Sequence, residues 1–259
     1  MVLRMNFNPA DSRFVHLSPG NPRYFELGDS CFIPIGANIC FPRFETDEEK
    51  VFADYRRMME KLAHCGGNYF RIWLSCPFFE LEPHHVGEFD SRQRIRLERL
   101  LRMAAELHLR VKITLEHFRI IEGKYIEFFP GVAGFVKQIH HVDHGGSSQT
   151  MLEFFTLPEA RAAFLGKLDY LAQYFRENEA VFAWELWNEI NGVGEETPLM
   201  DAWMTWSEQM LSEARKRFPN HMVIQSLGSF DSIAANREYD WLCRSACDFV
   251  QVHRYTALG

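Results

Sequence analysis

Short apolar segments alternate with longer amphipathic ones along almost the whole chain, and this alternation constrains the fold more than any other feature. Six apolar segments have the length and residue content of buried β-strands. They cover residues 31–39, 68–74, 110–116, 181–187, 221–226 and 248–253. Because single helical patterns lie between the successive segments, the order predicts parallel βαβ units in an α/β fold. A closed barrel and an open doubly wound sheet would both produce this pattern.

Local signals predict where the intervening helices begin. Thr46 and Glu49 form one expected capping box, and Thr156 and Glu159 form another. Asp90 precedes a further amphipathic stretch and is its expected N-cap. The predicted helices cover residues 46–65, 90–107, 156–178, 197–218 and 232–246.

The composition is that of an ordinary soluble protein and limits the classes of partner. The 259 residues are 47% hydrophobic and 24% charged, which predicts a single domain over residues 1–259. The net charge of −7 argues against a nucleic-acid partner, and no segment is long and apolar enough to predict a membrane partner. The first residues lack the apolar core of a secretory signal, so we expect a cytoplasmic protein, or a secreted one whose leader was removed. The oligomeric state stays open.

Polar side chains gather where the predicted strands end. They are Asn38, Arg71, Glu116, His117, Asn188, Glu189, His253 and Tyr255. In a parallel barrel these strand ends share one face, which is where such folds place their chemistry. No glycine-rich phosphate loop follows any of the strands, so nucleotide binding has no support and no cofactor is expected.

The segment Trp184-Glu185-Leu186-Trp187-Asn188-Glu189 resembles the acid/base motif of clan A glycoside hydrolases, most closely glycoside hydrolase family 5, the cellulase and mannanase family. Gly36-Ala37-Asn38, Asn68-Tyr69-Phe70-Arg71 and His253-Arg254-Tyr255 extend the resemblance from about residue 24 to the C-terminus. The resemblance implies a (β/α)8 TIM barrel, with about six of its eight βα units in this chain. It also implies a retaining glycoside hydrolase that cleaves β-linked oligo- or polysaccharides of the mannan or glucan type.

The same resemblance implies a role for each residue of these motifs. Glu189 would be the general acid/base, and Asn188 would bind the sugar 2-hydroxyl. Arg71 would hold the nucleophilic carboxylate ionised, and His253 and Tyr255 would contact the nucleophile and the substrate. Such an acid has to be protonated when it meets the substrate, and apolar surroundings favour that form.

Several of these residues also have a purely structural interpretation. Trp187 and Ile190 flank Glu189 and would supply its apolar surroundings. By strand alternation Glu185 shares the inward face with Trp187 and Glu189, so Arg71 could simply pair with Glu185. His253 and Tyr255 could likewise be packed core residues.

Five further residues near strand ends are candidate sugar contacts: Asn38, Phe41, Trp73, His117 and Trp187. For the aromatic residues among them, packing in the core is the alternative. The stretch 118–155 is too long for a plain connection, and we expect it to form a rim over the substrate groove. No metal is expected, because His84, His85, His140, His141, Asp143 and His144 follow no recognised ligand pattern.

One part of the family pattern has no match. The family nucleophile is a Glu that ends the seventh strand, and this chain stops four residues after Tyr255. We therefore expect the domain to be incomplete at the C-terminus. Two alternatives stay open. One is a non-catalytic carbohydrate-binding relic of the fold, and the other is an unrelated barrel enzyme such as an aldolase or isomerase. For the latter, Lys112 lies in a strand without the groups that usually accompany a Schiff-base lysine.

Overall fold

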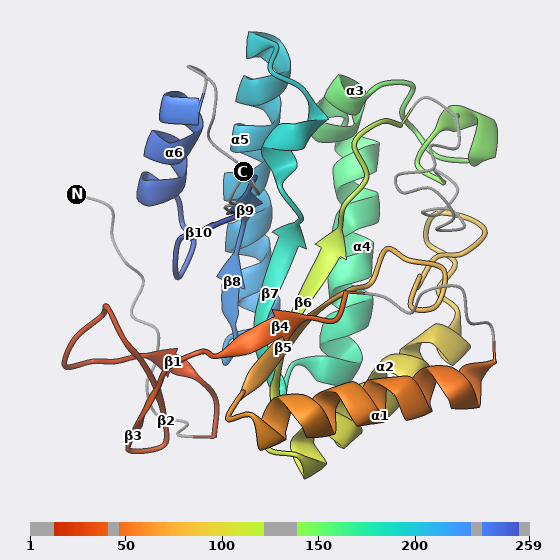
Figure 1. Ribbon diagram of the computed structural model, residues 1–259. Helices are drawn as coiled ribbons and strands as arrows, with labels where there is room; N and C mark the ends of the chain where they lie inside the picture. The colour runs from red at the N-terminus through yellow and green to blue at the C-terminus, as the bar shows by residue number, and fades with distance from the viewer. Residues whose placement is uncertain (1–12, 41–46, 122–138, 229–234, 254–259) are drawn as a thin grey trace, which may run out of the picture.

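A parallel sheet forms the centre of the molecule (Figure 1). The computed structural model describes residues 13–40, 47–121, 139–228 and 235–253. The sheet has five strands in chain order: β4 (Gly36–Asn38), β5 (Tyr69–Trp73), β6 (Arg110–Glu116), β7 (Val181–Trp187) and β8 (Met222–Ile224). One residue after β8, β9 (Ser226–Leu227) pairs in parallel with β10 (Gln251–Val252). The predicted parallel βαβ order is therefore confirmed.

Helices follow the strands and cover the sheet from outside. They are α1 (Glu48–His64), α2 (Ser91–Glu106), α3 (Met151–Thr156), α4 (Pro158–Phe175), α5 (Thr197–Arg217) and α6 (Ala235–Arg244), with short 3-10 turns at Val142–His144 and Ile190–Val193. Helix α1 lies beside α2, and α4 lies beside α5 (Figure 1). No helix in the described part of the chain is long and apolar enough to cross a membrane.

The predicted strand boundaries differ in accuracy. The third and fourth predicted strands, residues 110–116 and 181–187, coincide with β6 and β7. The first predicted strand, residues 31–39, is wrong as a single element. Its first part belongs to β3 (Ser30–Phe32) and its last part to β4, and these two strands lie in different sheets.

Both predicted capping boxes also need correction. Asp47 caps α1, because its carboxylate accepts hydrogen bonds from the backbone amides of Glu49 at 3.0 Å and Lys50 at 3.3 Å. Thr156 ends α3, and its hydroxyl donates to the Leu152 carbonyl at 2.7 Å. The predicted cap at Asp90 is confirmed, since its side chain accepts from the Arg92 amide.

An antiparallel three-stranded sheet precedes the barrel strands and was not predicted. It consists of β1 (His16–Leu17), β2 (Phe25–Leu27) and β3. The pairing of β6 with β7 is irregular after Val111. Val111 pairs with Val181, but Lys112 pairs with Ala183, so the register passes over Phe182. Its ring contacts the rings of Phe25, Phe32, Tyr69 and Phe249. The small sheet therefore packs against the amino-terminal end of the barrel strands, opposite the end where the polar residues gather.

Candidate functional site

A buried ion pair stands at the centre of the sheet's inner side. The guanidinium of Arg71 on β5 donates two hydrogen bonds to the Glu185 carboxylate on β7, at 2.8 and 2.5 Å. Lys112 and Thr114 on β6 also reach Glu185, at 3.2 and 3.0 Å. Burial alone would raise the pKa of Glu185, but the charges of Arg71 and Lys112 outweigh it and hold the pKa well below its usual range. Glu185 is therefore an ionised anchor for three strands.

Asn188 and Glu189 follow directly at the carboxyl end of β7. The Asn188 side-chain oxygen accepts a hydrogen bond from Arg71 at 2.8 Å, so the buried ion pair also orients the Asn188 amide. Glu189 has φ of 52°, a left-handed conformation that is uncommon for a residue with a side chain. Its backbone amide donates to the Ser226 hydroxyl at 3.0 Å, which fixes this turn against β9. Strained backbone of this kind clusters at functional sites.

The Glu189 carboxylate is held from two sides. One oxygen lies 2.6 Å from Nδ1 of His253, and the other accepts a hydrogen bond from Nη2 of Arg119 at 3.1 Å. Arg119 is itself anchored, because Nη1 donates to the backbone carbonyls of His117 and Asn188. A Cβ atom at Gly192 would come within 2.6 Å of Nε of Arg119, so the guanidinium packs against bare backbone there. Glu189 keeps 21% of its side chain exposed and can be reached by a ligand.

These surroundings of Glu189 differ from the expected apolar ones. Its flanking residues Trp187 and Ile190 are fully buried and belong to the core. In the described part of the chain, nitrogens of Arg119 and His253 lie against the Glu189 carboxylate. A nearby cation favours the ionised form of a carboxyl group, whereas apolar surroundings would favour the protonated form.

Trp73 and His117 form a stacked pair near the same strand ends. Their ring centroids are 4.9 Å apart, and the Arg71 guanidinium lies over the Trp73 ring at 5.5 Å. His117 Nδ1 lies 2.5 Å from the Ser75 hydroxyl. Burial lowers the pKa of His117 to about 3, and the charges of Arg119 and Arg71 add to this effect, so the ring is neutral near neutral pH.

Other predicted site residues lie elsewhere. The indole of Trp187 is enclosed by the rings of Phe118, Phe154, Phe155 and Trp206, so the structure places it in the core and not on a sugar-binding surface. Asn38 is exposed on the edge strand β4, beside Arg71 in the register. Phe41 and Tyr255 lie outside the described residues.

Glu116 points away from the inner site. Its carboxylate contacts the ammonium of Lys167 on α4, which also lies 3.0 Å from Glu82 and 4.0 Å from Glu80. Burial raises the pKa of Glu116 to about 7, although the charge of Lys167 opposes it. This cluster of buried charges ties β6 and α4 to the stretch after β5.

The predicted rim and its histidines are described only in part. His140 is buried and packs on the rings of Phe118 and Phe154. Burial lowers the pKa of His140 to about 4, with the charge of Lys167 adding to the shift. Within the described ranges, His, Cys, Asp and Glu side chains form no group of three that could hold a metal ion.

Sequence reasoning missed two contributors to the site. Arg119 follows two residues after His117, and only the tertiary structure brings it to Glu189. Gln251 could have been predicted from the sequence. Two residues apart on a strand, Gln251 and His253 point to the same face, and in the structure their side chains lie 2.8 Å apart.

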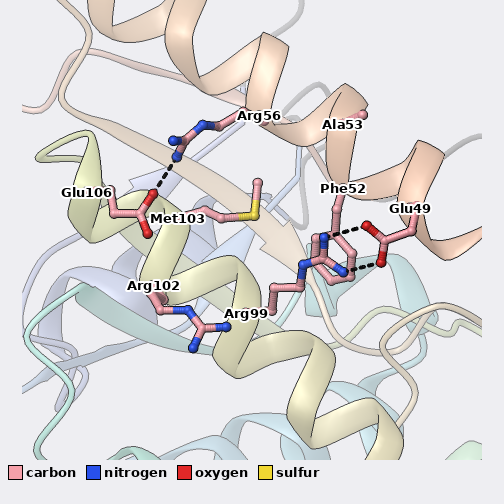
Figure 2. A pocket seen from close by; sticks show the side chains of 8 residues that line it. All are labelled: Glu49, Phe52, Ala53, Arg56, Arg99, Arg102, Met103 and Glu106. Carbon is pink, nitrogen blue, oxygen red and sulfur yellow. Dashed lines mark hydrogen bonds and ion pairs between the residues drawn. The ribbon is translucent and has the colours of Figure 1, made fainter.

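A depression of about 400 Å³ lies outside the barrel, between α1 and α2 (Figure 2). Four of its five charged side chains pair with one another, and Arg102 is the fifth: Arg99 donates two hydrogen bonds to Glu49, at 2.6 and 2.7 Å, and Arg56 donates one to Glu106 at 2.7 Å (Figure 2). We interpret it as a salt-bridged seam between two helices.

Comparison with known proteins identifies the fold. The sequence matches no protein-family model and no curated protein. Solved structures do match: the exo-β-1,4-mannosidase Op5Man5 from Opitutaceae bacterium strain TAV5 superposes with a TM-score of 0.63 at 17% identity, over 95% of this chain and 40% of that one. The β-mannanase of the blue mussel Mytilus edulis gives 0.65 at 13% identity, over 96% and 76%. The endo-1,4-β-mannanase of Rhizomucor miehei gives 0.66 at 16% identity, over 93% and 71%.

These similarities confirm the predicted fold class. The chain has an α/β fold that corresponds to part of a (β/α)8 barrel. It spans about two fifths of the length of the first of these structures and about three quarters of the other two.

Proposed function

We propose that this chain belongs to a retaining glycoside hydrolase that cleaves β-linked glycans, with mannan preferred over glucan. The observation that carries the proposal is the Asn188-Glu189 pair at the carboxyl end of β7. There Glu189 is partly exposed, and Arg119 and His253 orient its carboxylate. Carboxyl ends of barrel strands are where this fold carries its active sites. The preference for mannan takes its support from the similar structures, which are named a β-mannosidase and β-mannanases.

In the proposed reaction Glu189 acts twice. As an acid it protonates the glycosidic oxygen while a second carboxylate attacks the sugar, and as a base it then activates the water that releases the product. Asn188 is held by Arg71 in an orientation that suits it to bind the sugar hydroxyl next to the reacting carbon. The attacking carboxylate has no motif match in the 259 residues, so the proposal assigns only the acid/base half of the site.

Hydrolysis assays with a matched pair of variants test the proposal. The protein that carries these 259 residues is purified and incubated with β-1,4-mannan, manno-oligosaccharides and cello-oligosaccharides, and the released sugars and their anomeric configuration are followed by NMR. Glu189→Gln should lower kcat on these substrates by about 10²–10⁴-fold, the usual contribution of general acid–base catalysis. Glu177→Gln, on the exposed surface, is the control and should leave kcat unchanged.

Aryl glycosides with an acidic phenol sharpen the test, because such a leaving group departs without a proton. Glu189→Gln should slow their first cleavage step far less than it slows cleavage of manno-oligosaccharides. If the protein that carries this chain binds manno-oligosaccharides but hydrolyses none of these substrates, and Glu189→Gln leaves the binding unchanged, the carbohydrate-binding relic is the better description. Inversion of the anomeric configuration would contradict the retaining mechanism.

A further inference from the structure

A continuous chain of hydrogen bonds connects a buried lysine with the Glu189 carboxylate. The ammonium of Lys112 on β6 donates to the side-chain oxygen of Gln251 on β10. The side-chain nitrogen of Gln251 lies 2.8 Å from Nε2 of His253, and Nδ1 of His253 lies 2.6 Å from Glu189. Lys112 comes from β6, Gln251 from β10, His253 from the residue after β10 and Glu189 from the turn after β7, so the parallel strands set their order.

The chemistry of each group fixes the direction of every hydrogen bond in this chain. An ammonium group only donates, so it must face the oxygen of the Gln251 amide. The amide nitrogen, which also only donates, is thereby turned toward Nε2 of His253. Nε2 must then accept, and the ring proton sits on Nδ1, from which it is donated to the Glu189 carboxylate.

Lys112 is charged and firmly placed near neutral pH. Its side chain is buried, and the ammonium lies 3.2 Å from the Glu185 carboxylate, which Arg71 also contacts. Burial lowers the pKa of Lys112 to about 8, and the charge of Glu185 opposes this shift. A lysine with that pKa still carries its proton at neutral pH.

We propose that Lys112 and Gln251 are positioning residues that hold His253 as the neutral, Nδ1-protonated tautomer. His253 thereby donates a hydrogen bond to Glu189 and cannot take up a second proton without facing the Gln251 amide nitrogen. The inference deepens the proposed function, because it leaves Glu189 as the group of this pair that exchanges a proton with the substrate. Two further charged groups contact this hydrogen-bonded series in the described part of the protein. Arg119 contacts the other oxygen of Glu189, and Glu185 lies beside Lys112.

Nitrogen-15 NMR of the histidine rings in the full chain tests the inference, since it distinguishes the two neutral tautomers and the imidazolium ion. Near neutral pH, His253 should show a protonated Nδ1 and an unprotonated Nε2. His221 supplies an internal reference, because Trp184 donates to its Nδ1 at 3.2 Å and its Nε2 lies 3.0 Å from the Asn178 carbonyl, which requires the opposite tautomer. An imidazolium ion or an Nε2-protonated His253 in the wild-type chain would overturn the inference.

Two variants extend the test to the positioning residues. In Gln251→Glu the new carboxylate can only accept, so both nitrogens of His253 should become protonated near neutral pH. In Lys112→Met nothing orients the Gln251 amide, and His253 should populate both neutral tautomers. Unchanged His253 signals in Gln251→Glu would overturn the inference, even if Lys112→Met fails to fold. His221 should keep its signals in both variants.

The NMR measurement needs no catalysis, so it separates the two proposals. An Nδ1-protonated His253 in a chain that hydrolyses no glycan contradicts the proposed function alone. Glu189-dependent hydrolysis by a chain whose His253 is Nε2-protonated contradicts the positioning role alone.

Discussion

At the residue scale, the two contacts of Glu189 bear on the pH at which it can act. Arg119 lies 3.1 Å from one carboxylate oxygen, and a neighbouring cation favours the ionised form. The first step of the proposed reaction requires the protonated form. Arg119 therefore favours the form of Glu189 that this step does not use.

Replacing Arg119 should change this balance. In Arg119→Gln the cation is gone and no longer favours the ionised form of Glu189, so the alkaline limb of kcat/KM should shift to higher pH. The measurement is the pH profile of kcat/KM on a manno-oligosaccharide. Arg176→Gln, an exposed residue that pairs with its neighbour Glu177, serves as the control. A limb that stays in place would show that Arg119 does not influence the proton of Glu189.

The buried pair of Arg71 and Glu185 makes a separate prediction about stability. In Arg71→Met the fully buried Glu185 keeps one cationic partner among the described residues, Lys112. Removing one partner of a buried pair typically costs about 3–5 kcal/mol of unfolding free energy. Arg57→Met removes an exposed pair with Asp54 and should cost less than about 1 kcal/mol. Denaturant titrations of both variants check this, and equal losses would contradict it.

At the element scale, His221, directly before β8, forms hydrogen bonds to β7 and to the turn before β7. Its Nδ1 accepts from the Trp184 indole, which requires a neutral ring, and its Nε2 donates to the Asn178 carbonyl. Burial lowers the pKa of His221 from 6.5 to about 4, although the Asn178 carbonyl opposes this. Between these values the unfolded chain binds a proton that the folded chain does not, so the contribution of His221 to stability is complete above about pH 6.5 and is lost as the pH falls toward 4.

The His221→Gln variant isolates this contribution. Its amide does not titrate, so the slope of unfolding free energy against pH in this window should fall by about 1.4 kcal/mol per pH unit, the value for one proton. Denaturant titrations at several pH values measure the slope. The exposed His84 is the matched control, and His84→Gln should keep the wild-type slope. Equal slopes in the wild type and His221→Gln would contradict the prediction.

The sequence predicts elements well where local patterns decide and poorly where distant contacts decide. Strand β6 alternates polar and apolar residues, and β7 is apolar except for Glu185. Both are buried along nearly their whole length, and their boundaries could be read directly from the sequence. The strands β1, β2 and β3 have two or three residues each, too few for a periodic signal.

In the site, alternation placed Glu185 correctly beside Arg71. It misplaced Trp187, because α3 supplies the rings of Phe154 and Phe155 that draw the indole into the core.

At the scale of the whole molecule, the described strands leave two open edges, one on the five-stranded sheet and one on the β9–β10 pair. Strand β4 pairs only with β5, and β10 pairs only with β9, among the strands of the described residues. Exposed apolar side chains accompany the first edge, since Ile33 is 61% and Ile35 is 56% exposed. An unpaired strand edge with apolar neighbours is a template for pairing with another chain.

We therefore predict that the isolated 259-residue chain self-associates through the β4 edge. Sedimentation velocity should show an average mass that rises with protein concentration. Ile35→Lys places a charge beside that edge and should weaken the association, because edge lysines oppose strand pairing. Ile95→Lys is the control, since Ile95 is 51% exposed but lies on the outer helix α2. A chain that stays monomeric over the whole concentration range would contradict the prediction. Self-association of Ile35→Lys as strong as that of the wild type would show that the contact does not use the β4 edge.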